Sequence, residues 1–262
     1  MNKLSIGQAW VESAAFLRAE RRLLVPLCLA TLVLPATILT LVMPTEPGGA
    51  PMTMADRPEP GPWMIVGLAA LAAMLVGQLA ISRLALGWHG SLAEALRHGA
   101  RRFVPMFAAN LLLAVLVVIP LILILAIIQL VAAAAANVAL VLLSIPILML
   151  FIRASLSLPV AAATTIGPVV ILRRAFSISR GASLRLLGFA LLFIAAAMVV
   201  AGAVSAVVGA VVIALLGQPE PWTVAATLLA LIAGLLQALI IALWSVMLAR
   251  IYAQLAIVPG VS

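Results

Sequence analysis

The sequence predicts an all-α integral membrane protein, a single domain over residues 1–262 with six transmembrane helices and short amphipathic helices on the cytoplasmic face. Its composition is the first reason, because 66% of the residues are hydrophobic and only 8% are charged, whereas about 25% are charged in an average soluble protein. The length of the apolar runs is the second reason, since a bilayer core of about 30 Å takes roughly 20 helical residues. Runs that meet this length are 23–43, 63–82, 105–131, 138–158, 187–216 and 223–249.

The distribution of basic residues is the third reason and predicts the orientation. Short loops rich in Lys and Arg stay on the cytoplasmic side of a membrane. If the segment before the first run is cytoplasmic, fourteen of the fifteen Lys and Arg residues lie on the inner side, and only Arg57 lies outside. The inner segments then carry a net charge of +11 and the outer loops −3. We therefore expect cytoplasmic N- and C-termini and contacts with anionic lipid of the inner leaflet, and no nucleic-acid partner.

Residues 1–22 are predicted to form an N-terminal interfacial helix before the first span. Apolar residues recur there at near-helical spacing, namely Leu4, Ile6, Trp10, Ala14 and Leu17. The apolar run that follows has 21 residues, more than the core of about 7–15 in a cleaved secretory signal, so we expect an uncleaved first span. Within it lies Cys28, the only cysteine, which excludes an intrachain disulfide and suits a packing role.

Two further polar stretches on the inner side have helical patterns. Residues 91–104 begin with Ser91 and Glu94, the spacing of a capping box. Residues 168–180 place apolar side chains on one stripe and arginines elsewhere, and Gly181 suits a helix end. We expect both to lie in the inner interface, as residues 4–17 do, with the arginines toward lipid phosphates. The alternative is ordinary cytoplasmic loops whose arginines only fix the topology.

The arrangement of these segments predicts a threefold internal repeat of interfacial helix, outward span, hairpin and inward span. Arginines precede the odd-numbered spans at intervals of 80 and 83 residues, namely Arg22, Arg102 and Arg185. Each even-numbered span carries one arginine near its inner end, namely Arg83, Arg153 and Arg250. Transporter folds often arise from such repeats.

Arginines at the inner edge are the candidate contacts for anionic headgroups, namely Arg83, Arg153, Arg173, Arg174, Arg180 and Arg250. Arg153 follows only fifteen apolar residues, or about 22 Å of helix, so its backbone is expected inside the membrane boundary. We expect its side chain to extend to the headgroups, because a central arginine costs about 2.5–3.5 kcal/mol. In the alternative, Arg83, Arg153 and Arg250 converge on one anionic headgroup or substrate.

The interior of the spans predicts bends and a packing face. Prolines interrupt spans one, three and four, where we expect kinks; these are Pro26, Pro35, Pro120 and Pro146. In the fifth span, Gly202, Ser205 and Gly209 form a small-residue pattern. Such a pattern allows close helix contact, either within the bundle or with another subunit.

Catalytic and metal-binding patterns are missing from the sequence. His89 and His98 lie nine residues apart without a set of acidic or thiol partners, which makes them weak evidence for a metal. No nucleophile, phosphate-binding or zinc motif occurs, and no span contains Asp or Glu. We therefore expect no enzyme activity, no cofactor and no metal.

The central part of the chain resembles a known family. Residues 151–160, Phe-Ile-Arg-Ala-Ser-Leu-Ser-Leu-Pro-Val, and 167–181, Gly-Pro-Val-Val-Ile-Leu-Arg-Arg-Ala-Phe-Ser-Ile-Ser-Arg-Gly, are similar to the central pattern of the glycerophosphoryl diester phosphodiesterase membrane-domain family of bacteria. The matching positions are Leu172, Arg173, Arg174, Arg180 and Gly181, while Ala175 and Phe176 stand where Ser and Trp are usual. The stretches 6–10 and 250–252 are also similar. The resemblance implies a bacterial inner membrane. Some members carry a phosphodiesterase domain after the membrane part, for which we expect no room here.

Two functions remain open from the sequence. The first is a non-enzymatic scaffold or regulatory module that acts with a protein partner, a second copy or lipid, as the small-residue span and interfacial helices favour. The second is a transporter or exporter of a lipid-like or amphipathic anionic molecule. The repeat, the kinked spans and the inner-edge arginines favour that alternative, and the lack of an intramembrane acid opposes it.

Overall fold

The computed structural model describes residues 5–42, 61–88, 90–131, 136–219 and 222–256, and within them the secondary structure is helical with no strand. Six segments are long and apolar enough to cross a membrane: Arg21–Val42, Pro62–Ala85, Leu92–Ile128, Leu142–Ala163, Ser183–Leu216 and Val224–Ala256. The predicted all-α, six-span architecture is therefore confirmed. Arg57 and His89 lie outside the described residues.

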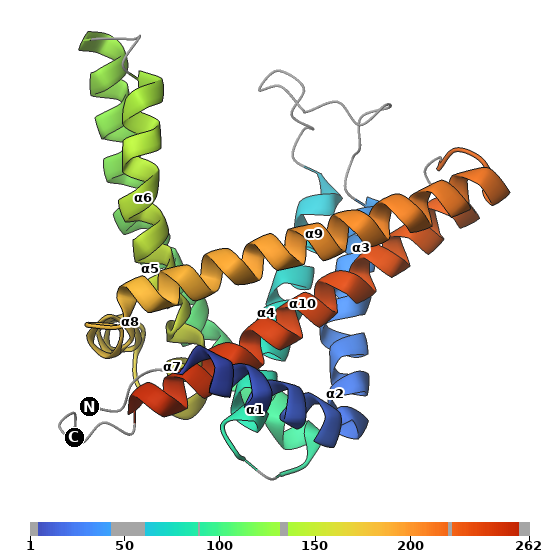
Figure 1. Cartoon of the computed structure of the whole chain (residues 1–262), viewed down its shortest axis with the longest axis horizontal. Helices are drawn as coiled ribbons and strands as arrows, with labels where there is room; N and C mark the ends of the chain where they lie inside the picture. Colours follow the sequence, from blue (N-terminus) through green and yellow to red (C-terminus); the bar gives the residue numbers. More distant parts are fainter. Residues whose placement is uncertain (1–4, 43–60, 89, 132–135, 220–221, 257–262) are drawn as a thin grey trace.

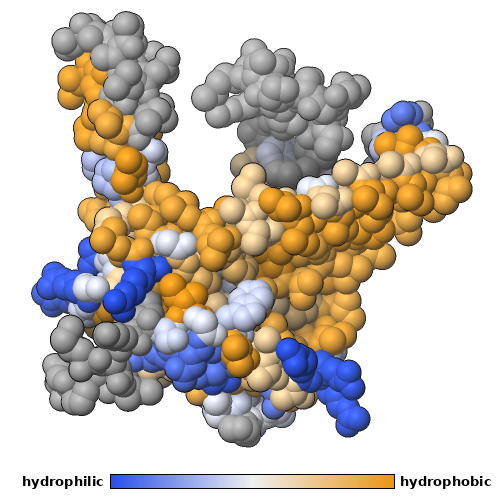
Figure 2. All heavy atoms as spheres, in the orientation of Figure 1, coloured by the Kyte–Doolittle hydropathy of each residue, from blue (hydrophilic) through white to orange (hydrophobic). Residues whose placement is uncertain are grey.

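Hydrophilic side chains gather at one end of the molecule (Figure 2). This end carries helix α1 (Ile6–Ala19), helix α8 (Pro168–Ile178) and the last turns of helix α10 (Val224–Ala256). We call it the basic end, defined by Arg83, Arg153 and Arg250. Long apolar helices extend from it toward the opposite side, as an amphipathic protein in a bilayer requires.

The first span consists of α2 (Arg21–Cys28), a π-helical turn η1 (Leu29–Val33) and α3 (Leu34–Val42). Pro35 has no backbone N–H to donate to the carbonyl four residues earlier, so a regular α-helix cannot continue through this point unchanged. A π-turn adds a residue to the helical turn and absorbs this defect. The irregularity expected from the prolines of this span thus takes the form of η1.

Helix α4 (Pro62–Ala85) packs closely against the first span and α10. A Cβ atom at Gly77 would overlap the side chain of Thr31 in η1, and one at Gly234 of α10 would lie 2.7 Å from Oγ1 of Thr37 in α3. Glycine at these two positions therefore sets how closely the helices approach. Together these helices enclose one of the two apolar clusters of the core.

Helices α5 (Leu92–Val131) and α6 (Ala136–Ser155) form a long hairpin that stands away from the other helices at its far end (Figure 1). The predicted capping box is present, with Ser91 N–H donating to Glu94 Oε2 and Glu94 N–H to Ser91 Oγ, both at 3.3 Å. The stretch 91–104 was expected to be a separate helix, but it is continuous with the third span through Pro105. One buried stripe crosses that proline and holds both parts on the same neighbours: Ala95, Gly99, Arg102, Met106, Ala109, Leu113 and Val117.

The fourth span continues beyond α6 into a short helix, α7 (Ser157–Ala163). Helix α8 follows and ends close to the predicted position, where Gly181 has a φ of +85°. Helices α9 (Ser183–Leu216) and α10 then run side by side, obliquely across α4 (Figure 1). Burial is concentrated near the basic end, where α7, α8 and the end of α10 meet. The described side chains in the outer halves of α5, α6 and α9 contribute little to the core.

Candidate functional site

The three arginines that end the even-numbered spans each lie over an aromatic ring at the basic end. The guanidinium carbon of Arg83 is 4.7 Å from the ring centre of Trp88, that of Arg153 is 5.3 Å from Phe176, and that of Arg250 is 5.4 Å from Phe16. These distances are in the range of cation–π contacts. Phe16 belongs to α1, Phe176 to α8, and Trp88 to the turn before α5. Each even-numbered span is thus connected to a polar segment outside the bundle.

Arg153 donates two hydrogen bonds within its own chain. Its Nε donates to Ser179 Oγ at 3.0 Å and its Nη2 to the Phe176 carbonyl at 2.9 Å. These bonds connect the end of α6 with the end of α8. Arg83 and Arg250 contact other elements, so the described contacts do not bring the three arginines to one shared ligand.

The arginines of α8 and of the turn after it are placed differently from one another. Arg173 in α8 and Arg180 just after it are exposed, as expected for groups that meet headgroups. Arg174 is half-buried, and its Nε is buried without a hydrogen-bond partner. The helix buries Ile171, Leu172 and Ala175 on its opposite face.

Arg102 is the most buried cation among the described residues, with 9% of its surface exposed. Its Nε donates to the Ala161 carbonyl at 3.2 Å and its Nη2 to the Ile166 carbonyl at 2.7 Å. His98, one helical turn earlier, has its Nε2 3.0 Å from the Ala162 carbonyl. The first turns of α5 therefore bind the carbonyl groups that α7 leaves open at its C-terminal end.

A cavity of about 250 Å³ lies at the basic end between α1, α2, α4 and α10. Its walls combine two charged residues, two aromatic rings and small or aliphatic residues: Glu20, Arg250, Phe16, Trp88, Leu23, Leu84, Gly87 and Gly90. Arg250 Nε is buried and has no hydrogen-bond partner. No ion pair joins Glu20 to Arg250 within 4.0 Å, although both line this cavity. This cavity combines charged and aromatic side chains, and it is our candidate site.

The glycines beside Trp88 explain how its ring is held at this cavity. Gly87 has a φ of +90°, which ends α4 and turns the chain sharply. A Cβ atom at Gly90 would overlap the Trp88 ring. Only glycine at position 90 therefore leaves room for the ring where it lies.

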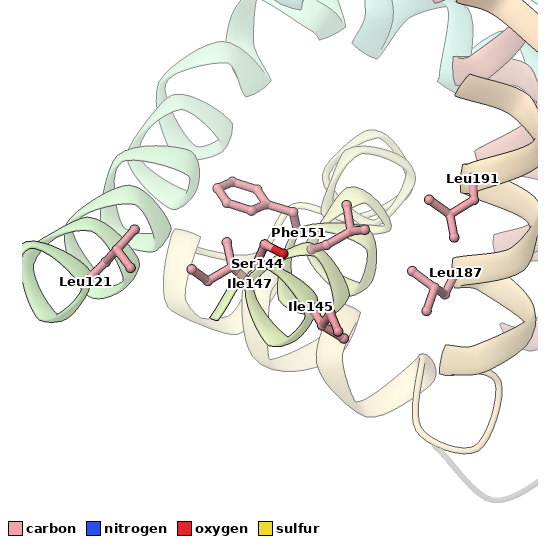
Figure 3. Close-up of a pocket in the computed structure, with 8 residues that line it drawn as sticks. Leu121, Ser144, Ile145, Ile147, Phe151, Leu187 and Leu191 are labelled. Atoms are coloured by element: carbon pink, nitrogen blue, oxygen red, sulfur yellow. The ribbon is translucent and has the colours of Figure 1, made fainter. Parts of the chain in front are cut away.

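Three larger grooves are almost wholly apolar. One of about 540 Å³ separates α6 from α9, and Figure 3 shows Leu187 and Leu191 of α9 on one side with Phe151 and Ile147 of α6 on the other. A second, of about 570 Å³, runs between α9, α10 and α1. A third, of about 520 Å³, lies between the first span and α10 and has Arg21 near its basic end. Grooves with such walls suit acyl chains or apolar helix faces.

The small-residue pattern predicted in the fifth span does not pack within the chain. Gly202 and Ser205 are exposed and Gly209 is half-buried. A Cβ atom added at Gly202 or Gly209 would meet nothing within 4 Å. The sequence allowed this pattern to make contact either within the bundle or with another subunit. The contact within the bundle is not made.

Comparison with other proteins finds no match. No family model, no curated protein and no solved structure is similar to this chain.

Sequence reasoning named Arg83 and Arg250 but missed the residues that complete the site. Phe16 and Glu20 lie more than 200 residues before Arg250, and only the folding of α1 onto α10 brings them together. Trp88 was the exception that could have been found, since an aromatic ring five residues after a helix-ending arginine is within reach of its side chain.

Proposed function

We propose that this chain is a non-enzymatic scaffold of the bacterial inner membrane and that α9 joins it to a second copy of itself. The observation that supports the proposal is the exposure of α9. Of its 34 residues, four are buried, namely Leu186, Phe189, Ala190 and Val212. Between Ala195 and Ala210 most residues are Ala, Gly or Ser. Interfaces between transmembrane helices are enriched in such small residues, because they let two backbones approach closely.

A second copy is the occupant that fits this face best. Gly202, Ser205 and Gly209 are three and four residues apart, so they lie on one side of the helix. Two copies inserted in the same orientation present identical α9 helices in parallel. A two-fold axis along the membrane normal would pack each face against its equivalent, the usual arrangement of a symmetric dimer. The proposal includes cytoplasmic termini and membership of the membrane-domain family that residues 151–181 resemble.

Native mass spectrometry of the protein extracted with its surrounding bilayer tests this assignment. We expect a dimer for the wild-type chain and a monomer for Ser205→Leu combined with Gly209→Leu, because the larger side chains keep the helices apart. The matched control is Val200→Leu with Val207→Leu, two exposed positions on the opposite side of α9, which should stay dimeric. A monomeric wild type, or a defined complex with a different protein, would contradict self-association through α9.

Transport or export of a lipid-like or amphipathic anion is the second candidate function. The groove between the first span and α10 favours it, because its apolar walls end near Arg21. A lipid tail could lie in this groove with its phosphate at the arginine. Movement of a headgroup-labelled phospholipid across reconstituted vesicles, lost in Arg21→Gln, would support this function over the scaffold. Equal movement in vesicles with and without the protein would count against it.

A further inference from the structure

The cavity at the basic end carries two opposite charges that do not meet. Glu20 caps the C-terminal end of α1 and Arg250 lies in the last turns of α10. Both line the cavity, yet they do not form an ion pair. Opposite charges that share a partly enclosed space normally close on each other, because each loses hydration there. Their separation leaves room for a ligand that pairs with both.

Arg250 offers N–H donors to this space. Its guanidinium lies over the Phe16 ring, while its Nε is buried without an acceptor. This buried atom lies out of reach of a molecule in the cavity, whereas the terminal N–H groups of the same guanidinium could donate to an anionic oxygen there. Arg83 does not line the cavity, but it lies over Trp88, which does, so a second positive charge close to the cavity also favours an anion here.

The carboxylate of Glu20 favours a cationic N–H donor on the same ligand. A carboxylate accepts hydrogen bonds best from a charged N–H donor. The only other charged group on the cavity wall is Arg250, which it does not reach. A ligand with a phosphate at one end and a primary ammonium at the other complements the two side chains.

The size and position of the cavity indicate a headgroup rather than a larger molecule. Pockets for drug-sized ligands are usually about 300–1,000 Å³, and this one is about 250 Å³. Leu23 and Leu84 form part of its wall, and these residues belong to two of the candidate membrane spans. A lipid whose glycerol and acyl chains lie along these spans could place its headgroup between α1, α4 and α10.

We propose that this cavity binds the phosphoethanolamine headgroup of a membrane phospholipid, with its phosphate at Arg250 and its ammonium at Glu20. This assignment is independent of the dimer proposed for α9. It predicts selectivity among three common headgroups. Phosphatidylglycerol has the phosphate without a cation. Phosphatidylcholine has a cation with no N–H to donate to Glu20.

The test is lipid retention by the full chain, extracted from bilayers that contain equal amounts of phosphatidylethanolamine, phosphatidylglycerol and phosphatidylcholine. Native mass spectrometry counts the lipids that stay bound. We expect phosphatidylethanolamine to be enriched about tenfold over the other two, the value of one charge-assisted hydrogen bond. Glu20→Gln should abolish this enrichment and leave phosphatidylglycerol bound at least as well, because Arg250 then acts alone. Arg250→Gln should lose both lipids.

Two control variants distinguish binding in this cavity from a general attraction of lipids to the positive charge of the basic end. Glu12→Gln on the same helix and Arg97→Gln at the same end of the molecule remove equal charges away from the cavity, and both should keep the enrichment. If Arg250→Gln does not fold, Glu20→Gln still decides the question. Equal retention of the three lipids, or an enrichment unchanged in Glu20→Gln, would overturn the proposal. Binding of soluble phosphoethanolamine without retention of the lipid would overturn it as well.

Discussion

At the residue scale, Arg102 shows how a charge can be structural inside a membrane protein. Its two hydrogen bonds reach carbonyl groups at and just beyond the end of α7, 59 and 64 residues away in the sequence. These acceptors lie at a helix end, so no intrahelical donor replaces Arg102 if it is removed. The residue therefore holds the fourth span against the third.

We expect Arg102→Gln to destabilise the protein by about 2–3 kcal/mol, because hydrogen bonds to charged groups contribute about 1.5–3 kcal/mol and buried acceptors are left unpaired. Thermal unfolding of the purified protein in detergent measures the change. Arg97→Gln, exposed on the same helix, is the matched control and should melt with the wild type. A melting temperature of Arg102→Gln equal to that of Arg97→Gln would show that the two bonds do not stabilise the fold.

The functional residues could be predicted from sequence only in part. Charge and position at the end of a span identified Arg83, Arg153 and Arg250, since hydropathy alone shows where a helix leaves the apolar region. Their partners depend on which helix packs against which, and hydropathy carries no such information. For the same reason the spacing of the arginines before the odd-numbered spans did not distinguish Arg102 from Arg22. Arg102 is a buried anchor, whereas Arg22, at the equivalent position of the predicted repeat, is exposed.

At the element scale, the close contact between α4 and η1 depends on Gly77, which has no side chain. In Gly77→Ala the new Cβ would overlap Thr31, and overpacking of this kind costs about 1–3 kcal/mol. This exceeds the gain of up to about 1 kcal/mol from replacing a helical glycine by alanine. We expect a lower melting temperature for Gly77→Ala.

Position 67 of the same helix provides the control for this experiment. There a Cβ would lie 3.5 Å from Leu39 Cδ1, an ordinary contact. Gly67→Ala should therefore gain the helix propensity without the overlap and melt at or above the wild-type temperature. Equal melting of the two variants would mean that the first span shifts freely to accommodate the methyl group.

The helices themselves were largely predictable, because apolar runs of sufficient length have few alternatives in a membrane. The spans begin and end within a few residues of the expected positions, with three exceptions. Helix α5 is continuous through Pro105, the fourth span extends through α7 to Ala163, and α10 continues to Ala256. In all three places the segment next to the predicted span has its own buried face, so packing continues where hydropathy falls. The irregularity near Pro35 was also expected, but the sequence did not indicate that it would be a π-turn.

At the scale of the whole molecule, the two sides differ in charge and in packing. The core and most arginines lie at the basic end, whereas α9 and the described side chains in the outer part of the α5–α6 hairpin are largely exposed. A chain that is well packed on one side and open on the other has apolar surface that lipid or another helix must cover. In the two proposals above, the exposed face of α9 contacts a second copy of the chain, and the basic end binds a lipid headgroup.

The orientation of these two sides in the membrane is the last prediction. Gln218, exposed after α9, should lie outside, and Arg180, exposed after α8, should lie in the cytoplasm, as the distribution of basic residues requires. In a Cys28→Ser background, which has no other cysteine, we expect Gln218→Cys to react with a membrane-impermeant maleimide in right-side-out vesicles. Arg180→Cys should react only after the vesicles are opened. Reactions in the reverse order would place both termini outside, and reaction of both positions in closed vesicles would exclude a fifth span between them.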